Sequence, residues 1–158
     1  MNKNEYFSHK SAVVSKNAKI GKNSKIWHFS HIREDTKIGN NVIIGQNVYI
    51  DAGVVIGNNC KIQNNVSIYK GVVIENNVFI GPSVTFTNDL YPSVEDWNEN
   101  MIVKTLIKSS ASIGANATIV CGNTIGSNSM IGAGSVVTKD IPKGVLAFGN
   151  PAKVVRNV

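Results

Sequence analysis

Residues 37–50 read KIGNNVIIGQNVYI, a stretch in which the same pattern returns every six residues. Isoleucine stands at 38, 44 and 50, and asparagine follows three residues later at 41 and 47. An α-helix has a period of about 3.6 residues and a strand a period of about 2, so neither produces a spacing of six. The spacing predicts short repeated units that stack on one another.

The six-residue spacing continues through most of the chain. A first run extends from Val14 to Phe86, and a second run extends from Ile107 to Val137. Between these ends stand Ile20, Ile26, Ile32, Ile38, Ile44, Ile50, Ile56, Ile62, Ile68, Ile74 and Ile80, then Ile113, Ile119, Ile125 and Ile131. Stacked units would place these side chains in one interior ladder.

A second position of the repeat, three residues after the aliphatic one, is rich in Asn, Asp and Gly. These residue types best tolerate the left-handed backbone region, so the pattern predicts one positive φ angle in each turn. The first run places there Asn17, Asn23, Phe29, Asp35, Asn41, Asn47, Gly53, Asn59, Asn65, Gly71, Asn77, Ser83 and Asp89. The following residue is small or β-branched, as an inward-facing corner requires.

Composition agrees with a β structure. The 158 residues include 19 Ile and 20 Val but only 3 Leu, which argues against a helical bundle. The length predicts one domain, residues 1–158. No apolar run reaches the roughly 18 residues that span a bilayer. The two cysteines, Cys60 and Cys121, form no spaced framework, so we expect a reducing, cytoplasmic location.

Hexapeptides such as Ile38-Gly39 and Ile125-Gly126 resemble those of the left-handed parallel β-helix. The resemblance implies an all-β solenoid in which three hexapeptides form a triangular coil and residues eighteen apart stack. The break between the two runs implies one extruded loop at about residues 87–106. A loop of this length in a regular solenoid is usually functional.

The C-terminal part resembles the coenzyme-binding end of acetyl-CoA-dependent acyltransferases of this fold. The matching segments are Ile131–Pro142, which contains Gly-Ala-Gly-Ser-Val-Val-Thr-Lys-Asp, and Gly149–Arg156. The resemblance implies that the backbones of Ala115 and Ala133 bind the pantetheine arm. It places Thr138, Lys139, Lys153 and Arg156 near the adenine and the phosphates, which suits their charges. It implies acetyl-CoA as cosubstrate and no metal.

The N-terminal part is similar to 3-N-acetyltransferases of nucleotide-linked 3-amino sugars, which supply bacterial surface polysaccharides such as lipopolysaccharide. The similarity rests on Ile26–His31, Gly45–Val48, Lys61–Tyr69, Gly81–Ser83 and Phe86–Asn88. It implies a UDP- or dTDP-linked sugar held by Gln46, Asn64, Asn65, Tyr69 and Asp89. Ser93 follows Pro92 where the UDP-glucuronate enzymes have arginine, which favours a neutral dTDP-linked hexose.

The candidate catalytic residues are Asn88, His28 and His31. Related acetyltransferases often have a histidine base in the loop, but this chain has no histidine after His31. Asn88 takes that place and cannot titrate. The resemblance implies that Asn88 orients a sugar amine, which attacks without a strong base. His28 and His31 remain candidates for proton transfer, or they pack at a subunit seam with Trp27 and Phe29.

The same resemblance implies a homotrimer with sites between subunits, and Trp27 and Phe29 at outward positions agree with an interface. Other functions stay open: acetyl transfer to another amine or to a hydroxyl, or a non-catalytic β-helix scaffold. A zinc hydratase of the gamma carbonic anhydrase type needs three histidines per zinc, and this chain has only three in total, none in its middle coils. The net charge of +6 permits a nucleic-acid partner, but the basic residues are scattered.

Overall fold

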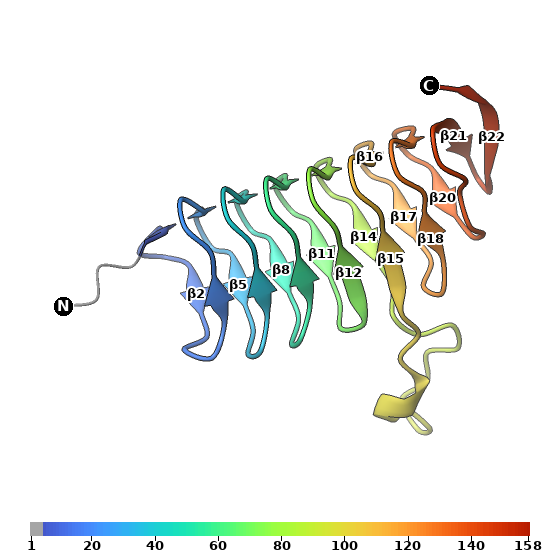
Figure 1. Ribbon diagram of the computed structural model, residues 1–158. Coiled ribbons are helices and arrows are strands. Elements are labelled where there is room, and N and C mark those ends of the chain that lie inside the picture. The colour runs from blue at the N-terminus through green and yellow to red at the C-terminus, as the bar shows by residue number, and fades with distance from the viewer. Residues whose placement is uncertain (1–4) are drawn as a thin grey trace.

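The computed structural model describes residues 5–158, so residues 1–4 of the predicted domain lie outside the described residues. The chain winds into a stack of triangular coils, and its strands form one sheet along each side of the triangle (Figure 1). The predicted left-handed parallel β-helix is therefore confirmed. Between residues 5 and 158, no helix is long and apolar enough to cross a membrane.

Three sheets build the solenoid. Sheet A contains β1 (Phe7–Ser8), β4 (Lys25–Ile26), β7 (Ile43–Ile44), β10 (Lys61–Ile62), β13 (Phe79–Ile80), β16 (Ser112–Ile113), β19 (Met130–Ile131), β21 (Val145–Gly149) and β22 (Ala152–Asn157). Sheet B contains β2 (Val13–Val14), β5 (His31–Ile32), β8 (Tyr49–Ile50), β11 (Ser67–Ile68), β14 (Thr85–Phe86), β17 (Thr118–Ile119) and β20 (Val136–Val137). Sheet C contains β3 (Lys19–Ile20), β6 (Lys37–Ile38), β9 (Val55–Ile56), β12 (Val72–Ile74), β15 (Thr105–Ile107) and β18 (Thr124–Ile125).

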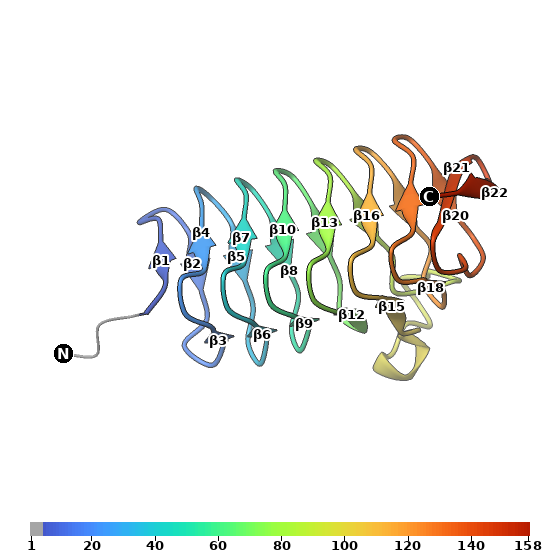
Figure 2. The same cartoon turned by 45° about the horizontal axis from the view of Figure 1, so that its top comes forward.

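Two corners of the triangle matter for function, and we name them by the sheets they join. The A–B corner comprises residues 9–12, 27–30, 45–48, 63–66, 81–84, 114–117 and 132–135. The B–C corner comprises residues 15–18, 33–36, 51–54, 69–71, 87–104, 120–123 and 138–140. Figure 2 shows the strands of sheet A in a row from β1 to β16.

The register follows the predicted eighteen-residue rule. Ile26 pairs with Ile44, which pairs with Ile62, which pairs with Ile80, and all four are fully buried. Ile80 then pairs with Ile113, because the long loop intervenes. Each coil therefore adds the same aliphatic layer to one continuous core, and the burial of these side chains is the main stabilising contribution.

The turns adopt the predicted left-handed conformation at most positions. Asn23, Asn41 and Asn59 have φ angles of 59°, 56° and 58°, and Phe29 and Ser83 share that conformation. The prediction is wrong at Asn17 and Asp89, which have no positive φ. The backbone N–H of Asn17 donates to Ser15 Oγ in the first turn, and Asp89 leaves the coil to enter the loop.

Asparagine ladders join successive coils at the remaining corner. Asn40 Oδ1 accepts the backbone N–H of Lys22, and Asn58 Oδ1 accepts that of Asn40, each at 2.8 Å. Asn76 Oδ1 accepts the N–H of Asn58 at 2.7 Å. The backbone N–H at this position of each turn thus finds an acceptor one coil further on.

The chain departs from the regular coil at two places. The loop leaves after β14 and returns at β15, which begins at Thr105, so it covers residues 87–104 rather than 87–106. It carries a short 3₁₀ helix, η1 (Glu99–Met101), and projects from the stack (Figure 1). At the C-terminus β21 and β22 form an antiparallel hairpin, which the repeat did not predict.

Glu75 links the coil that precedes the loop to the coil that follows it through hydrogen bonds. Its Oε2 accepts hydrogen bonds from Ser109 N and Ser109 Oγ, both at 2.8 Å. We expect Glu75→Ala to lower the free energy of unfolding by about 1 kcal/mol in a denaturant titration at pH 7. Glu95→Ala, in the exposed loop, is the matched control and should change it by less than about 0.5 kcal/mol.

The same contact predicts a pH dependence. The hydrogen bonds from Ser109 lower the pKa of Glu75 below its ordinary value of 4.5. Its contribution is therefore complete above pH 4.5 and is lost as the pH falls through the lowered pKa. The stability difference between wild type and Glu75→Ala should shrink in that range, and a difference that grew on acidification would contradict this assignment.

Candidate active site

Asn88 lies at the base of the loop on the B–C corner. Its backbone oxygen accepts the N–H of Val103 at 2.9 Å, which closes the loop base. The half-buried side chain forms no hydrogen bond with residues 5–158, so its amide is free to bind a ligand. It lines a hollow of about 150 Å³ together with Lys70 from the coil below and Trp97 from the loop.

Asp51 organises the floor of this hollow. Its Oδ1 accepts hydrogen bonds from Arg33 Nη1 at 3.0 Å and from Tyr49 Oη at 3.1 Å. Its two oxygens also accept the backbone N–H groups of Ala52 and Lys70. Burial, which outweighs the hydrogen bond with Arg33, raises the pKa of Tyr49. These hydrogen bonds hold the side chains of Arg33, Tyr49 and Asp51 in place without a ligand.

Lys70 ties the loop to the solenoid. Its Nζ lies 2.9 Å from Glu99 Oε1 in η1. Asp89, predicted to bind substrate, accepts the N–H of Tyr91 with Oδ1 at 2.8 Å. Its other oxygen, Oδ2, is buried without a hydrogen-bond partner among the described residues. Asp89 does not line the hollow beside Asn88, so the structure does not place its carboxylate within reach of a ligand bound there.

The A–B corner carries a second group of predicted residues. His28, Gln46 and Asn64 stand eighteen residues apart in one column, and with Trp27 they line a hollow of about 280 Å³. Asn64 Oδ1 accepts the backbone N–H of Gln46 at 2.9 Å, which leaves the NH₂ group of Asn64 for a ligand. Asn65 instead holds the coils together, because its Oδ1 accepts from Asn47 Nδ2 at 3.0 Å.

Asn64 is the last residue of this column whose side chain accepts an N–H from the preceding coil. The next members are Pro82, Ala115 and Ala133, none of which has a side-chain oxygen to do so. Accordingly, the backbone N–H groups of Asn64, Ala115 and Ala133 have no acceptor among residues 5–158. Ala115 is half-buried and Ala133 is exposed, so an extended ligand that lies along this corner can reach both N–H groups.

Aromatic rings gather at the N-terminal end of the A–B corner. His28 stacks on His9 with ring centroids 3.6 Å apart, and Phe7 packs against Trp27 at 5.4 Å. Burial, with a smaller contribution from the neighbouring His28, lowers the pKa of His9. The other candidate base, His31, points outward from sheet B, where its ring lies 5.8 Å from that of Tyr49.

The predicted cationic residues occupy two places. Lys139 stands on the B–C corner, in the same column as Asn88 and two coils beyond it, and Thr138 precedes it. Lys153 and Arg156 lie on β22 at the end of sheet A, where Lys153 pairs with Phe148 across the hairpin. Within residues 5–158 these three cations form no ion pair, so they are available to an anion.

The structure therefore divides the predicted site between two corners. His28, Gln46, Asn64, Asn65, Ala115 and Ala133 lie on the A–B corner. Asn88, Asp89, Tyr69, Thr138 and Lys139 lie on the B–C corner. Sheet B separates the two groups, with His31 on its outer face. Each group contains residues predicted for the acceptor and residues predicted for the coenzyme, but a single chain does not bring them together.

Sequence reasoning missed the network below Asn88. Arg33, Asp51 and Tyr69 are eighteen residues apart, so the stacking rule already placed them in one column on the B–C corner. An arginine directly beneath an aspartate was the signal that could have found the Arg33–Asp51 pair. The contact between Lys70 and Glu99 had no such signal, because the loop does not follow the repeat. Among residues 5–158 no three His, Cys, Asp or Glu side chains form a metal-binding group.

Comparison with known proteins agrees with the repeat. The pattern described as "Bacterial transferase hexapeptide (six repeats)" matches residues 17–52 and 53–88. A second, described as "Hexapeptide repeat of succinyl-transferase", matches residues 35–70 and 111–139. The chain is built of the hexapeptide repeat of bacterial transferases. The repeat explains the solenoid, whereas a substrate would depend on the side chains at the two corners.

Individual hexapeptide-repeat transferases are similar in sequence to parts of this chain. A dTDP-3-amino-3,6-dideoxy-α-D-galactopyranose 3-N-acetyltransferase of Aneurinibacillus thermoaerophilus is 61% identical over 51 residues, which cover 32% of this chain and 27% of that protein. A galactoside O-acetyltransferase of Lactococcus lactis is 40% identical over 84 residues, 51% of this chain and 41% of that protein. The structure of a galactoside acetyltransferase with coenzyme A is 34% identical with a TM-score of 0.69, covering 82% of this chain and 66% of that one. The chain thus spans less than half the length of the two curated relatives.

Proposed function

We propose that the protein is an N-acetyltransferase that moves the acetyl group of acetyl-CoA to the amino group of a nucleotide-linked amino sugar. The observation that carries the proposal is that the hydrogen bond accepted by Asn64 does not recur beyond it, so the N–H groups of Ala115 and Ala133 lie in line without acceptors among residues 5–158. Two donors one coil apart, about 5 Å, suit the amide carbonyls of a pantetheine arm lying along the axis. A galactoside acetyltransferase of similar structure binds coenzyme A.

Asn88 orients the acceptor in this proposal. The nitrogen lone pair of the sugar amine attacks the thioester carbon, a C–N bond forms, and the C–S bond breaks to release the thiolate of coenzyme A. The proton lost from nitrogen neutralises the thiolate, directly or through water. The free amide of Asn88 holds the amine in line, and Asp89, next to it in the chain, is proposed to help bind the sugar once the loop adjusts to the ligand. Positioning of this kind lowers the barrier without a titrating base.

The acceptor class is inferred from the amide at the loop base and from one relative. The Aneurinibacillus protein acts on a dTDP-linked 3-amino sugar. Lys70 at the same hollow is engaged by Glu99, and Arg33 is engaged by Asp51 and Glu34, so among the described residues neither cation that lines this hollow is free for a sugar carboxylate. A neutral hexose linked to dTDP or UDP therefore suits the site better than a glucuronic acid. Its acylated product would enter bacterial surface polysaccharide.

A hydroxyl acceptor is the second candidate, because the Lactococcus relative is an O-acetyltransferase. A hydroxyl attacks only with help from a base. Asn88 cannot supply it, and His28 and His31 stand three coils, about 14 Å, before the coil of Asn88 along the solenoid, whichever subunit contributes them. We therefore rank the amine first.

We propose a homotrimer whose sites form between subunits. Sheet B lies between the A–B and B–C corners, so three chains that turn sheet B toward a common axis bring the A–B corner of one beside the B–C corner of the next. The outward side chains of sheet B after Tyr49 are small, namely Ser67, Thr85, Thr118 and Val136, which permits close approach. A closed three-fold arrangement would complete every site.

The single domain and the cytoplasmic location stay proposals as well. The described coils share one continuous core, as one domain would. Both cysteines are free thiols, which persist in a reducing compartment.

The direct test is acetyl transfer to a panel of UDP- and dTDP-linked amino sugars, followed by release of free thiol from acetyl-CoA. Turnover with one or more amino sugars, and none with the matching hydroxyl sugars, would support the proposal. Turnover with hydroxyl sugars alone would replace it by O-acetylation. Failure to bind coenzyme A in calorimetry would favour the alternative that the protein is a non-catalytic β-helix scaffold.

Lys139 and Arg156 should contribute charge to coenzyme binding. We expect Lys139→Ala and Arg156→Ala each to raise the KM for acetyl-CoA about three- to tenfold and to leave kcat nearly unchanged, since ground state and transition state lose the same contact. Lys16→Ala, a lysine of the first coil, is the control and should change neither constant. A loss of kcat at constant KM would show that the assignment is wrong.

A further inference from the structure

We propose that the aromatic cluster at the N-terminal end of the A–B corner is the binding platform for the nucleobase of the nucleotide-linked sugar. The cluster consists of Phe7, His9, Trp27, His28 and Phe29. The inference rests on the proposed function and extends it, because it assigns a site to the part of the substrate that does not react.

The rings form a continuous exposed surface. Trp27 and His28 lie nearly parallel with centroids 6.2 Å apart and an interplanar angle of 6°. Phe29 follows at 6.2 Å from His28. Phe29 is 63% exposed and Trp27 38% exposed, so the faces are available to a ligand. Aromatic faces beside polar groups are how proteins hold nucleobases, and stacking tolerates any base.

Phe29 is held in a strained conformation. Its φ angle is 57°, in the left-handed region where the same column has Asn47 and Asn65. A bulky side chain there costs on the order of 1 kcal/mol, and Phe29 regains little of this by burial because most of its side chain is exposed. The repeat thus departs from its own favoured residue to place an aromatic ring at the surface. Such departures are typical of ligand sites.

The cluster lies where the nucleobase end of the proposed substrate would be. Along the A–B corner the free amides of Ala133 and Ala115 come first, then Pro82, then Asn64, Gln46 and His28. Coils lie about 4.8 Å apart, so His28 is two steps, about 10 Å, from Asn64. If the acetyl group is delivered near Pro82 and the sugar lies over Asn64 and Gln46, the diphosphate leads to the aromatic rings. The hollow lined by Trp27, His28, Gln46 and Asn64 connects these positions.

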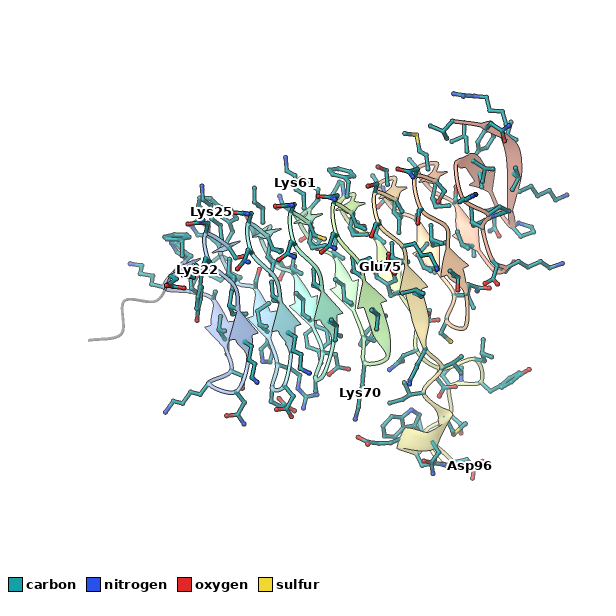
Figure 3. The ribbon with its side chains drawn as sticks, in the orientation of Figure 1. Lys22, Lys25, Lys61, Lys70, Glu75 and Asp96 are labelled. Carbon is teal, nitrogen blue, oxygen red and sulfur yellow. The ribbon has the colours of Figure 1, made fainter. Side chains whose placement is uncertain are left out.

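Charge favours a diphosphate in this place. Lys25 and Lys61 precede Trp27 and Gln63 by two residues on sheet A, and both are exposed. Neither forms an ion pair with the described part of the chain. Figure 3 shows both projecting from the same edge of the solenoid, the edge opposite the loop. Two free ammonium groups beside an aromatic platform match a nucleoside diphosphate better than an apolar partner surface.

The test is calorimetric binding of dTDP, UDP and inorganic pyrophosphate to the full chain and two variants. Phe29→Asn and Trp27→Gln introduce the residue types that later coils have in the same columns, Asn47 and Gln63, so both variants should fold. We expect each to raise the Kd of both nucleotides about tenfold, the effect of one lost base–aromatic stack. The Kd of pyrophosphate and of coenzyme A should stay unchanged. The matched control is Phe79→Ser, which introduces the residue type of Ser112, the neighbour of Phe79 on sheet A.

Three outcomes would overturn the inference. The first is a wild type that binds coenzyme A but neither nucleotide, and the second is an unchanged nucleotide Kd in both variants. The third is a weaker nucleotide affinity accompanied by dissociation of the oligomer in sedimentation, which would assign the cluster to a subunit contact. Nucleotide binding that depends on Phe29 in a chain that does not bind coenzyme A would support the platform and contradict the acetyltransferase proposal alone.

Discussion

Asn88→Ala should lower kcat for acetyl transfer by about ten- to a thousandfold, the range for one well-placed polar contact in a transition state. Asn88 heads the loop, and its side-chain amide has no partner in the described chain. Its contact with the amine is strongest when the lone pair is aligned with the thioester, so the loss falls on the chemical step. Binding of the nucleotide and of coenzyme A depends on other residues and should persist. Steady-state kinetics with both substrates varied measures the separation.

Two controls belong to this experiment. Asn100→Ala removes an amide from the exposed part of the same loop and should leave kcat unchanged. His28→Ala and His31→Ala should reduce kcat less than Asn88→Ala does, since His28 is stacked on His9 and His31 faces Tyr49. If Asn88→Ala were fully active and either histidine variant inactive, a histidine general base would replace the base-free mechanism.

The pattern of the sequence predicted the solenoid because each level of the repeat agrees with the others. Isoleucine every six residues provides the core, asparagine three residues later provides the left-handed turn, and eighteen-residue stacking places both in register. Where an element lies outside the repeat, prediction failed. The antiparallel hairpin β21–β22 and the exact return of the loop at Thr105 depend on tertiary pairing that no local period encodes.

The candidate site was predicted as a set of residues and not as an arrangement. The stacking rule applies to columns, so it placed His28, Gln46 and Asn64 together correctly. It says nothing of how two columns on different corners meet, and the resemblance to amino-sugar acetyltransferases supplied the residues of both corners without separating them. The separation of Asn88 from Asn64 by sheet B is what the structure adds, and in the proposed trimer it assigns the two halves of each site to different subunits.

The separation leads to the prediction with the clearest signature, complementation between two inactive variants. Asn88→Ala removes the B–C half of a site, and a double variant, Gln46→Ala with Asn64→Ala, removes the A–B half. If each site takes its halves from two chains, neither variant alone has an intact site. Unfolding the two together in equal amounts and refolding them gives mixed trimers in which about a quarter of the sites combine two intact halves.

We therefore expect activity to return to about a quarter of the wild-type value in the refolded mixture, and to stay at the level of the separate variants when they are mixed without unfolding. The comparison has an internal control, because a chain carrying all three substitutions, refolded with wild type, gives the same quarter of intact sites from a different combination. A site built within one chain predicts otherwise: the variant mixture would stay inactive, and the triple variant with wild type would keep half the activity. The two arrangements thus differ in both mixtures, and because each half-site is defined by a corner of the β-helix, the result also reports which corners meet in the assembly.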